Sequence, residues 1–331
     1  MNGTTEIVCT LFDVTGAITR PEIRLTKAEV ARQYGVDGRD LRSVDLVSEG
    51  IPHFVIRPST IFISLFSLRL LIQSDRALLV RVRPRDGDPH VYLQDIFVAD
   101  LQSKLRGDHQ SGFPISLPYE LRVVEAALAS TTAHLEAEHT LVRRNVERSM
   151  HALQSQDIAS TDPRILLESG KKLMNIAQRA RQMRSALQEL LNTDEDLAAM
   201  YLTDRRAGNH HAIEDHQEAE YLLEAYYKNN DAVEESAVAL FAEIRRTEDA
   251  IQSVLDVRRN QIMVFEAQLE ICMLGFAVST FVAGLYGMNV VNSLEESPFA
   301  FAGLVSGCVI GTLIIARYGL RRLRKFRKIE L

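Results

Sequence analysis

Acidic side chains recur at a helical interval in the last third of the chain, where they could attract or hold a divalent cation. Two series with a step of seven residues fall on one face of a helix. They are Asp249, Asp256, Met263, Glu270, Ala277 and Gly284, and Gln252, Arg259, Glu266, Met273, Thr280 and Gly287. This face begins acidic and ends in small residues, which suits a symmetric bundle of helices around a narrow, water-filled axis. Periodicity alone supports a solvated charged stripe on a coiled coil equally well.

The element that must position these residues is a very long helix. Between Gly208 and Gly275 the sequence contains neither proline nor glycine, so nothing breaks a helix there. We predict a helix over residues 214–289, roughly 110 Å long at 1.5 Å per residue, which must leave a globular domain as a stalk. Two further helices are predicted at residues 119–162 and 165–200, and we expect them to pack as a pair against the stalk. A loop is predicted after them at 204–211.

Two long uncharged segments lie near the end of the chain. Residues 271–294 and 297–316 contain no charged side chain, and only Glu295 and Glu296 separate them. A membrane-spanning helix needs about 20 predominantly apolar residues, so each segment can cross a bilayer. A buried hairpin in a soluble core is the alternative, which two adjacent uncharged segments of this length disfavour.

We therefore predict an integral membrane protein with two spans, at residues 269–289 and 298–317, joined by an outer loop at 290–297. Gly303, Gly307 and Gly311 have the small-xxx-small spacing of a close helix-packing face, which we expect to lie against the first span.

Basic residues follow the second span directly. Residues 317–328 hold seven Lys or Arg and no acid, whereas the loop between the spans holds two glutamates. Because basic residues stay on the cytoplasmic or matrix side, this pattern predicts that both termini, including the tail at 318–331, face inside. A lipid- or partner-binding patch is the alternative interpretation of the basic tail.

The first 115 residues differ in character from the rest. Short β-branched segments bounded by turn residues predict strands at 7–14, 53–58, 61–66, 68–73 and 77–82, and helices are expected at 27–34 and 91–105. The predicted fold class is thus an α+β membrane protein: an α/β domain at 1–115, a helical domain and stalk at 116–268, and two C-terminal spans.

Composition excludes several functions. The 331 residues carry a net charge of −6, and the basic excess is confined to the tail, which argues against nucleic acid as a partner. Cys9, Cys272 and Cys308 lie too far apart in sequence for a thiolate zinc site. No phosphate-binding glycine loop, nucleophile elbow or HExxH motif occurs, so the sequence gives no support to an enzyme.

The residues around the end of the first span carry a family resemblance. Tyr286, Gly287, Met288 and Asn289, followed by a short acidic loop and a second span, resemble the CorA magnesium-channel superfamily, whose signature is Gly-Met-Asn at this place. Its eukaryotic branch, named for mitochondrial RNA splicing, is similar in three further segments, in the same order. These are LPYELRVVEAAL at 117–128, DLAAMYLTD at 196–204 and YLLEAYY at 221–227.

The resemblance covers nearly the whole chain and implies a homopentameric Mg²⁺ channel whose first span lines the pore. Gly287, Met288 and Asn289 would then form the selectivity filter, where the Asn289 amide oxygens hydrogen-bond the water shell of Mg²⁺ without trapping the ion. Gly287 would allow the backbone to turn at the helix end. Glu295 and Glu296, beyond the filter, would raise the local concentration of cations.

Three residues match the family's pore positions at the inner mouth. A ring of Asp256 would concentrate cations, and a ring of Met263 would form an apolar constriction that closes by dewetting. A ring of Arg259 opposes cation flow, and we hypothesise that Arg259 limits conduction. It could also pair with Asp256 of a neighbouring chain or bind an anion.

Two groups of side chains have residue types that could bind a metal ion. Glu243, Glu248 and Asp249 on the stalk are candidates for sites at which inside Mg²⁺ favours the closed channel, and a solvated helix face explains them equally well. His210, His211, Glu214, Asp215 and His216 include zinc or nickel ligand types, but a solvated cluster at a helix start is the favoured interpretation.

Location and ion selectivity stay open. The resemblance implies the mitochondrial inner membrane, yet the first ten residues contain an acid and no arginine, unlike a transit peptide, so another membrane is the alternative. Transport of Zn²⁺, Co²⁺ or Ni²⁺ by the same fold, or a purely structural membrane-tethered coiled coil, are the alternative functions.

Overall fold

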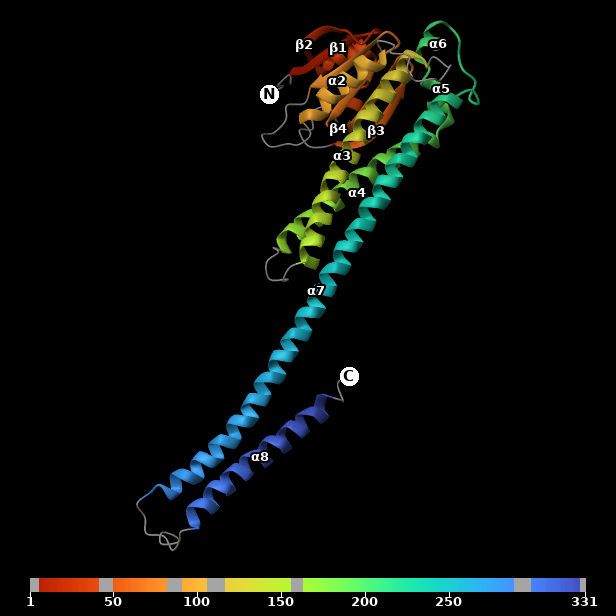
Figure 1. The fold of residues 1–331 in the computed structure, drawn as a ribbon. Coiled ribbons are helices and arrows are strands. Elements are labelled where there is room, and N and C mark those ends of the chain that lie inside the picture. Colours follow the sequence, from red (N-terminus) through yellow and green to blue (C-terminus); the bar gives the residue numbers. More distant parts are fainter. Residues whose placement is uncertain are drawn as a thin grey trace. The chain divides into compact units, whose positions relative to one another are not determined.

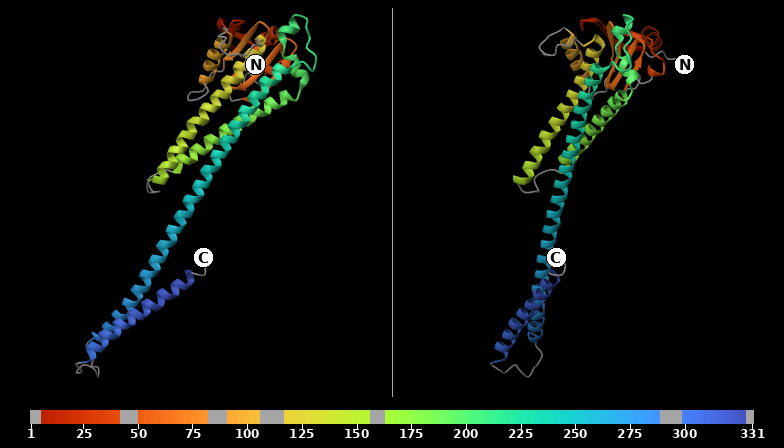
Figure 2. Two further views of the ribbon diagram at one scale, coloured as in Figure 1. Left: turned by 45° about the vertical axis from the view of Figure 1, so that its right-hand side comes forward. Right: turned by 90° about the vertical axis from the view of Figure 1, so that its right-hand side faces the viewer.

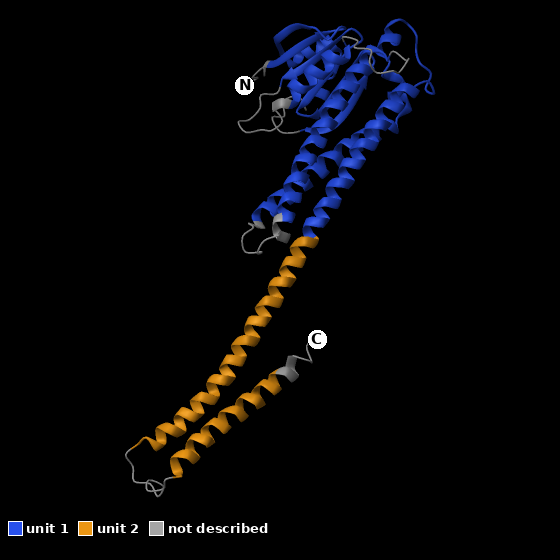
Figure 3. Cartoon of the chain, viewed as in Figure 1, with its two compact units in different colours: residues 1–245 blue, residues 246–331 orange. Residues whose placement is uncertain are grey.

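The computed structural model describes residues 6–41, 50–81, 91–105, 117–155, 163–288 and 299–327 (Figure 1). The chain divides into two compact units, residues 1–245 and 246–331 (Figure 3).

Unit 1 contains a six-stranded sheet in which all neighbouring strands are antiparallel, in the order β2-β1-β6-β5-β4-β3. The strands are β1 (Glu6–Asp13), β2 (Ile18–Thr26), β3 (Gly50–Arg57), β4 (Thr60–Phe66), β5 (Leu68–Ile72) and β6 (Arg76–Arg81). Five of them confirm the predicted strands. The sixth, β2, was not predicted because Pro21 interrupts its pattern, and the structure places it at the edge of the sheet, where a missing N–H donor is tolerated.

Helices cover both faces of the sheet, which explains why every residue of strands β4 and β5 is buried. Ile61, Ile63 and Leu65 face a core shared with α2 (Val91–Leu105) and α3 (Tyr119–Ser155), while Phe62 faces Val30 and Tyr34 of α1 (Lys27–Tyr34). The bounds of α1 and α2 are those predicted from sequence.

Local signals fix both ends of α1. Thr26 and Glu29 form a capping box at its start, with the Glu29 carboxylate accepting from the Thr26 N–H at 2.8 Å. Gly35 ends the helix with φ +63°, a left-handed conformation that glycine adopts without strain.

Three helices form a bundle below the sheet, as Figures 1 and 2 show from three directions. They are α3, α4 (Pro163–Leu191) and the first part of α7 (Gln217–Tyr286). Leu135 of α3, Leu173 of α4 and Val233 of α7 belong to one buried cluster. This confirms the prediction that an antiparallel pair packs against the long helix.

Charged pairs also connect these helices. Arg179 on α4 is only 5% exposed, pairs with Glu138 on α3 at 2.8 Å, and lies over the ring of Phe66, the last residue of β4. Asn230 on α7 donates to Thr132 on α3. The helices of the bundle are therefore joined to one another and to the sheet by both apolar and polar contacts.

The segment between α4 and α7 differs from the prediction. A single helix was expected over 165–200, but α4 ends at Leu191 and two short helices follow, α5 (Asp194–Ala199) and α6 (Leu202–Arg206). Thr193 lies before three acidic residues that occupy the first turn of α5, where negative charge favours a new helix start. Helix α6 also overlaps the start of the predicted loop at 204–211.

Unit 2 contains the rest of α7 and α8 (Ala300–Arg327). Both helices are long and apolar enough to cross a membrane, and only 6% and 0% of their most apolar windows are buried. Phe276, Phe281 and Phe301 are each more than 60% exposed in the single chain. A buried soluble hairpin would cover such side chains, so the apolar surface requires a bilayer or further chains around it.

The two helices of unit 2 touch through Gly275 and Thr312. A Cβ atom at Gly275 would lie 3.0 Å from Thr312 Cγ2, and the Thr312 hydroxyl is 2.6 Å from that of Ser279. The prediction that Gly303, Gly307 and Gly311 pack against the first span is wrong, because nothing lies within 4 Å of where their Cβ atoms would be. Two other glycines permit close approach: Gly275 on α7, and Gly319 on α8, where a Cβ atom would lie 2.5 Å from Ile271 Cγ2.

Candidate functional site

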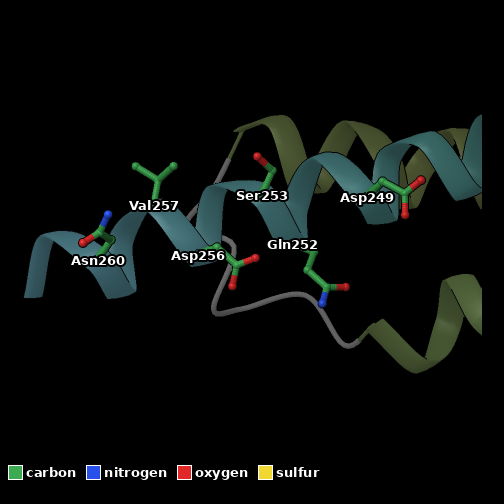
Figure 4. Close-up of a pocket in the computed structure, with 6 residues that line it drawn as sticks. All are labelled: Asp249, Gln252, Ser253, Asp256, Val257 and Asn260. Atoms are coloured by element: carbon green, nitrogen blue, oxygen red, sulfur yellow. The ribbon is translucent and has the colours of Figure 1, made fainter. Parts of the chain in front are cut away.

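A polar face on α7 carries the candidate cation ligands. Asp249, Gln252, Ser253, Asp256, Val257 and Asn260 line a shallow hollow on this helix, and Figure 4 shows Gln252 and Asp256 projecting from the same side. Five of the six carry side-chain oxygens, the ligand type that Mg²⁺ prefers. All six are exposed in the single chain. One chain therefore presents the donors on an open surface.

The three predicted pore residues follow one another along this part of α7. Asp256 and Arg259 are exposed, and Met263 is 51% exposed. Among the residues that the structure describes, neither Asp256 nor Arg259 forms a hydrogen bond or an ion pair. Both charges are thus available to water, to ions or to another chain.

The predicted filter begins where α7 ends. The Gly287 N–H still donates to the Ala283 carbonyl at 3.0 Å, and the Met288 N–H donates to Leu285 at 3.5 Å. Gly287 does not adopt a left-handed φ, and a Cβ atom there would meet only ordinary contacts at 3.5 Å. The expected glycine-dependent turn is therefore absent from this conformation. Asn289, Glu295 and Glu296 lie outside the described residues.

The predicted regulatory residues do not form a metal site within one chain. Across the described ranges, no group of three or more His, Cys, Asp or Glu side chains is arranged to hold an ion. Glu248 is half-buried, whereas Glu243 and Asp249 are exposed on α7. A site built on these residues would need ligands from a second chain.

The histidine cluster is held by protein contacts. His211 Nε2 lies 2.8 Å from an Asp204 carboxylate oxygen, and its Nδ1 lies 3.0 Å from one of Asp215. Its ring stacks on Tyr201 with the centroids 4.1 Å apart. Burial lowers the pKa of His211, but the hydrogen bond that its ring N–H donates to Asp204 and the contacts with Asp215 outweigh burial and raise the pKa overall. The arrangement fastens the loop before α7 and supports the non-metal interpretation.

The three segments that carry the sequence resemblance meet in unit 1. Glu120 of the first segment accepts hydrogen bonds from the N–H and hydroxyl of Thr203 in the second. The Tyr201 hydroxyl accepts from Ala219 N–H at the start of α7, and Leu223 of the third segment lies in the same core. Sequence reasoning missed Glu120, although an acid two residues after a proline in a largely apolar segment is a usable signal.

Comparison with solved structures gives the same fold. The CorA magnesium transporter of Methanocaldococcus jannaschii matches with a TM-score of 0.52 and 14% identity, covering 96% of this chain and 98% of that chain. The full-length CmaX protein matches with a TM-score of 0.51 and 16% identity, covering 98% and 100%. The chain therefore has a CorA-like fold: a sheet and helix domain, a long helix and two C-terminal apolar helices.

Sequence relatives are closer. A protein of Aspergillus fumigatus named mitochondrial inner membrane magnesium transporter mrs2 is 41% identical over 323 residues, covering 98% of this chain and 53% of the relative. The mitochondrial inner membrane magnesium transporter LPE10 of Yarrowia lipolytica is 37% identical over 327 residues, covering 98% and 70%.

The chain spans between 53% and 59% of the length of three such relatives, from Aspergillus fumigatus, Gibberella zeae and Neurospora crassa. The family model described as magnesium transporter MRS2-like matches residues 8–259, most of the chain. The resemblance found in the Gly-Met-Asn and helical segments is thereby confirmed, and the chain belongs to the MRS2-like family of magnesium transporters.

Proposed function

We propose that this chain is the subunit of a homopentameric channel that carries Mg²⁺ across the mitochondrial inner membrane, with α7 of each copy lining the pore. The relatives are named as magnesium transporters of that membrane. A single pair of spans cannot enclose a pore, so several copies must surround one axis.

The observation that carries this proposal is the exposed polar face of α7 in unit 2. Asp249 and Asp256 stand on the same helix that continues into an apolar span and ends at Tyr286, immediately before Gly287 and Met288. On a symmetry axis, exposed carboxylates would become rings that attract cations, and Met263 would form an apolar constriction. A structural coiled coil could carry the same acidic stripe on its solvated face, so Mg²⁺ flux is the property that separates the two functions.

Selection of Mg²⁺ would take place beyond the span. Mg²⁺ holds its octahedral water shell tightly, so the amide oxygens of five Asn289 side chains would bind the hydrated ion by accepting from its water. Gly287 and Met288 complete the filter, and Glu295 and Glu296 attract cations outside it. A membrane potential then drives the divalent ion inward with about 4.6 kcal/mol per 100 mV.

Orientation and division of the chain follow from the same proposal. The basic residues at 317–328, at the C-terminal end of α8, would keep both termini in the matrix. Residues 1–115 and 116–268 form the inward domain and stalk, 269–289 and 298–317 the spans, 290–297 the outer loop, and 318–331 the basic tail.

Inside Mg²⁺ would inhibit the channel by neutralising Glu243, Glu248 and Asp249 where chains meet, which favours the closed pentamer. Limited proteolysis of the full-length protein with and without millimolar Mg²⁺ tests this regulation. Protection by Mg²⁺ that a Glu248→Ala, Asp249→Ala variant lacks would support it, and identical cleavage with and without Mg²⁺ would contradict it.

Reconstitution of the full chain in liposomes tests the function itself. With an inside-negative potassium diffusion potential, we expect Mg²⁺ influx that increases with the potential. Competition by Zn²⁺, Co²⁺ and Ni²⁺ separates the candidates: uptake of one of these ions without Mg²⁺ uptake would assign a different cargo, and absence of all flux would leave the structural role.

A further inference from the structure

A cationic pocket lies in unit 1. Its walls come from three places in the sequence: the turn between β3 and β4, the turn between β5 and β6, and helix α6. The pocket encloses about 310 Å³, at the lower end of the range found for small-molecule sites. Its lining residues are Pro58, Ser59, Gln73, Ser74, Asp75, Arg76, Leu202, Arg205 and Arg206.

Positive charge exceeds negative charge in this pocket. Of the described side chains that line it, three are arginines and one, Asp75, is acidic. Asp75 is shared by Arg206 at 2.9 Å and Arg76 at 3.3 Å. Burial raises the pKa of Asp75, but the hydrogen bond from Arg206 and the charges of both arginines hold it below its ordinary value, so this carboxylate stays ionised and occupied.

Arg205 is left without a partner. Its guanidinium makes no hydrogen bond or ion pair in the described part of the chain, and neither does the hydroxyl of Ser59 on the opposite turn. The neighbouring acid, Asp204, pairs with His211 instead. The pocket thus contains a planar set of N–H donors and a hydroxyl with no protein acceptor, which is the donor set that binds phosphate oxygens in pairs.

We propose that this pocket binds a compact phosphate-bearing anion, with Arg205 as its main charge partner and Ser59 as a second donor. Three arginines and Asp75 leave the pocket with a net positive charge, which a ligand with two or more negative charges would neutralise. The volume of the pocket admits a group of the size of pyrophosphate. Because α6 also holds Glu120 and His211 through Thr203 and Asp204, an occupied pocket would stiffen the connection between the sheet and the start of α7.

Titration calorimetry of the full chain in detergent tests the site, with sodium pyrophosphate as the probe at constant ionic strength. EDTA in the calorimeter cell binds residual Mg²⁺, so that binding of Mg²⁺ by pyrophosphate does not contribute to the measured heat. We expect saturable binding by the wild type and a loss of at least tenfold in affinity for Arg205→Gln. Arg205→Lys should show an intermediate loss, because it keeps the positive charge but lacks the paired N–H donors of the guanidinium.

Two further variants make the result specific. Arg144→Gln, an exposed arginine on α3, should bind like the wild type, and Ser59→Ala should lose a few-fold without loss of thermal stability. Absence of saturable binding by the wild type would overturn the proposal. Equal affinity of wild type and Arg205→Gln would also overturn it, since the anion would then sit elsewhere, for example on the basic tail, and equally tight sulfate binding would refute the preference for phosphate.

Discussion

The carboxylate of Glu120, which is fully buried on α3, accepts a hydrogen bond from the Thr203 N–H on α6 at 2.8 Å and a second from the Thr203 hydroxyl. The two residues are 83 positions apart in sequence. Helix α6 has only five residues, which is too short for a helix to be stable by itself. The contact with Glu120 on α3 therefore fixes α6 in place.

Glu120→Ala should therefore destabilise the protein. The change removes the buried carboxylate that accepts from both the N–H and the hydroxyl of Thr203 and leaves a cavity on α3, so we expect a loss of about 3 kcal/mol in the free energy of unfolding. Thermal unfolding of the detergent-purified chain measures this, with Glu136→Ala, an exposed acid on the same helix, as the control. Equal midpoints for the two variants would contradict the role of Glu120.

Regular elements of this fold were predictable where one local rule decided the outcome. Helix α1 has a capping box and a terminal glycine, and the absence of proline and glycine marked the long helix, predicted at 214–289 and found at Gln217–Tyr286. Strand β2 was missed because only its place at the sheet edge makes Pro21 acceptable. Edge position is set by the whole sheet and leaves little trace in the strand itself.

Tertiary contacts were less predictable than elements. Gly303, Gly307 and Gly311 look like a packing face, but the observed contacts depend on how α7 and α8 cross, at Gly275 with Thr312 and at Gly319 with Ile271. The break after Leu191 and the Glu120 contact likewise depend on distant partners. For the candidate site, sequence supplied the residues along α7, while their assembly around an axis requires other copies of the chain.

Gly275→Leu should separate the two helices of unit 2. A Cβ atom at this position already lies 3.0 Å from Thr312 Cγ2 and 3.5 Å from the Thr312 carbonyl oxygen, so a larger side chain forces α7 and α8 apart and breaks the Ser279–Thr312 contact. We expect a drop of about 1–3 kcal/mol in stability, measured by thermal unfolding in detergent. Gly303→Leu, with open space around it, is the control, and a larger drop for this control than for Gly275→Leu would refute the crossing point.

His211 should make stability depend on pH. Its pKa is raised in the folded chain, so its contribution is fully present below the unfolded value of about 6.5 and is lost as the pH rises through the higher folded value. We expect His211→Gln to flatten the fall in unfolding midpoint above neutral pH, by an amount within about 1 kcal/mol. His210→Gln changes the adjacent, exposed histidine and should leave the pH dependence of the unfolding midpoint unchanged. If the midpoint of His211→Gln depended on pH as that of the wild type does, the contacts of His211 with Asp204 and Asp215 would not contribute to stability.

Arg259 should limit conduction. A ring of guanidinium groups near the inner mouth repels a divalent cation, so Arg259→Ser is expected to increase Mg²⁺ flux in liposomes several-fold. Arg258→Ser removes the same charge from the adjacent helix position and should change flux less, because it points to a different side of α7. Unchanged Mg²⁺ flux in Arg259→Ser would contradict the hypothesis that Arg259 limits conduction.

The most direct test of the proposed channel is Mg²⁺ influx into liposomes that contain wild type, Asn289→Ala or Asn292→Ala at equal protein density. If Asn289 supplies the filter oxygens, Asn289→Ala abolishes the flux while the oligomer, measured by light scattering in detergent, stays intact. Asn292→Ala, which removes a neighbouring amide from the same loop, retains the flux. Wild-type Mg²⁺ flux through Asn289→Ala would contradict the account.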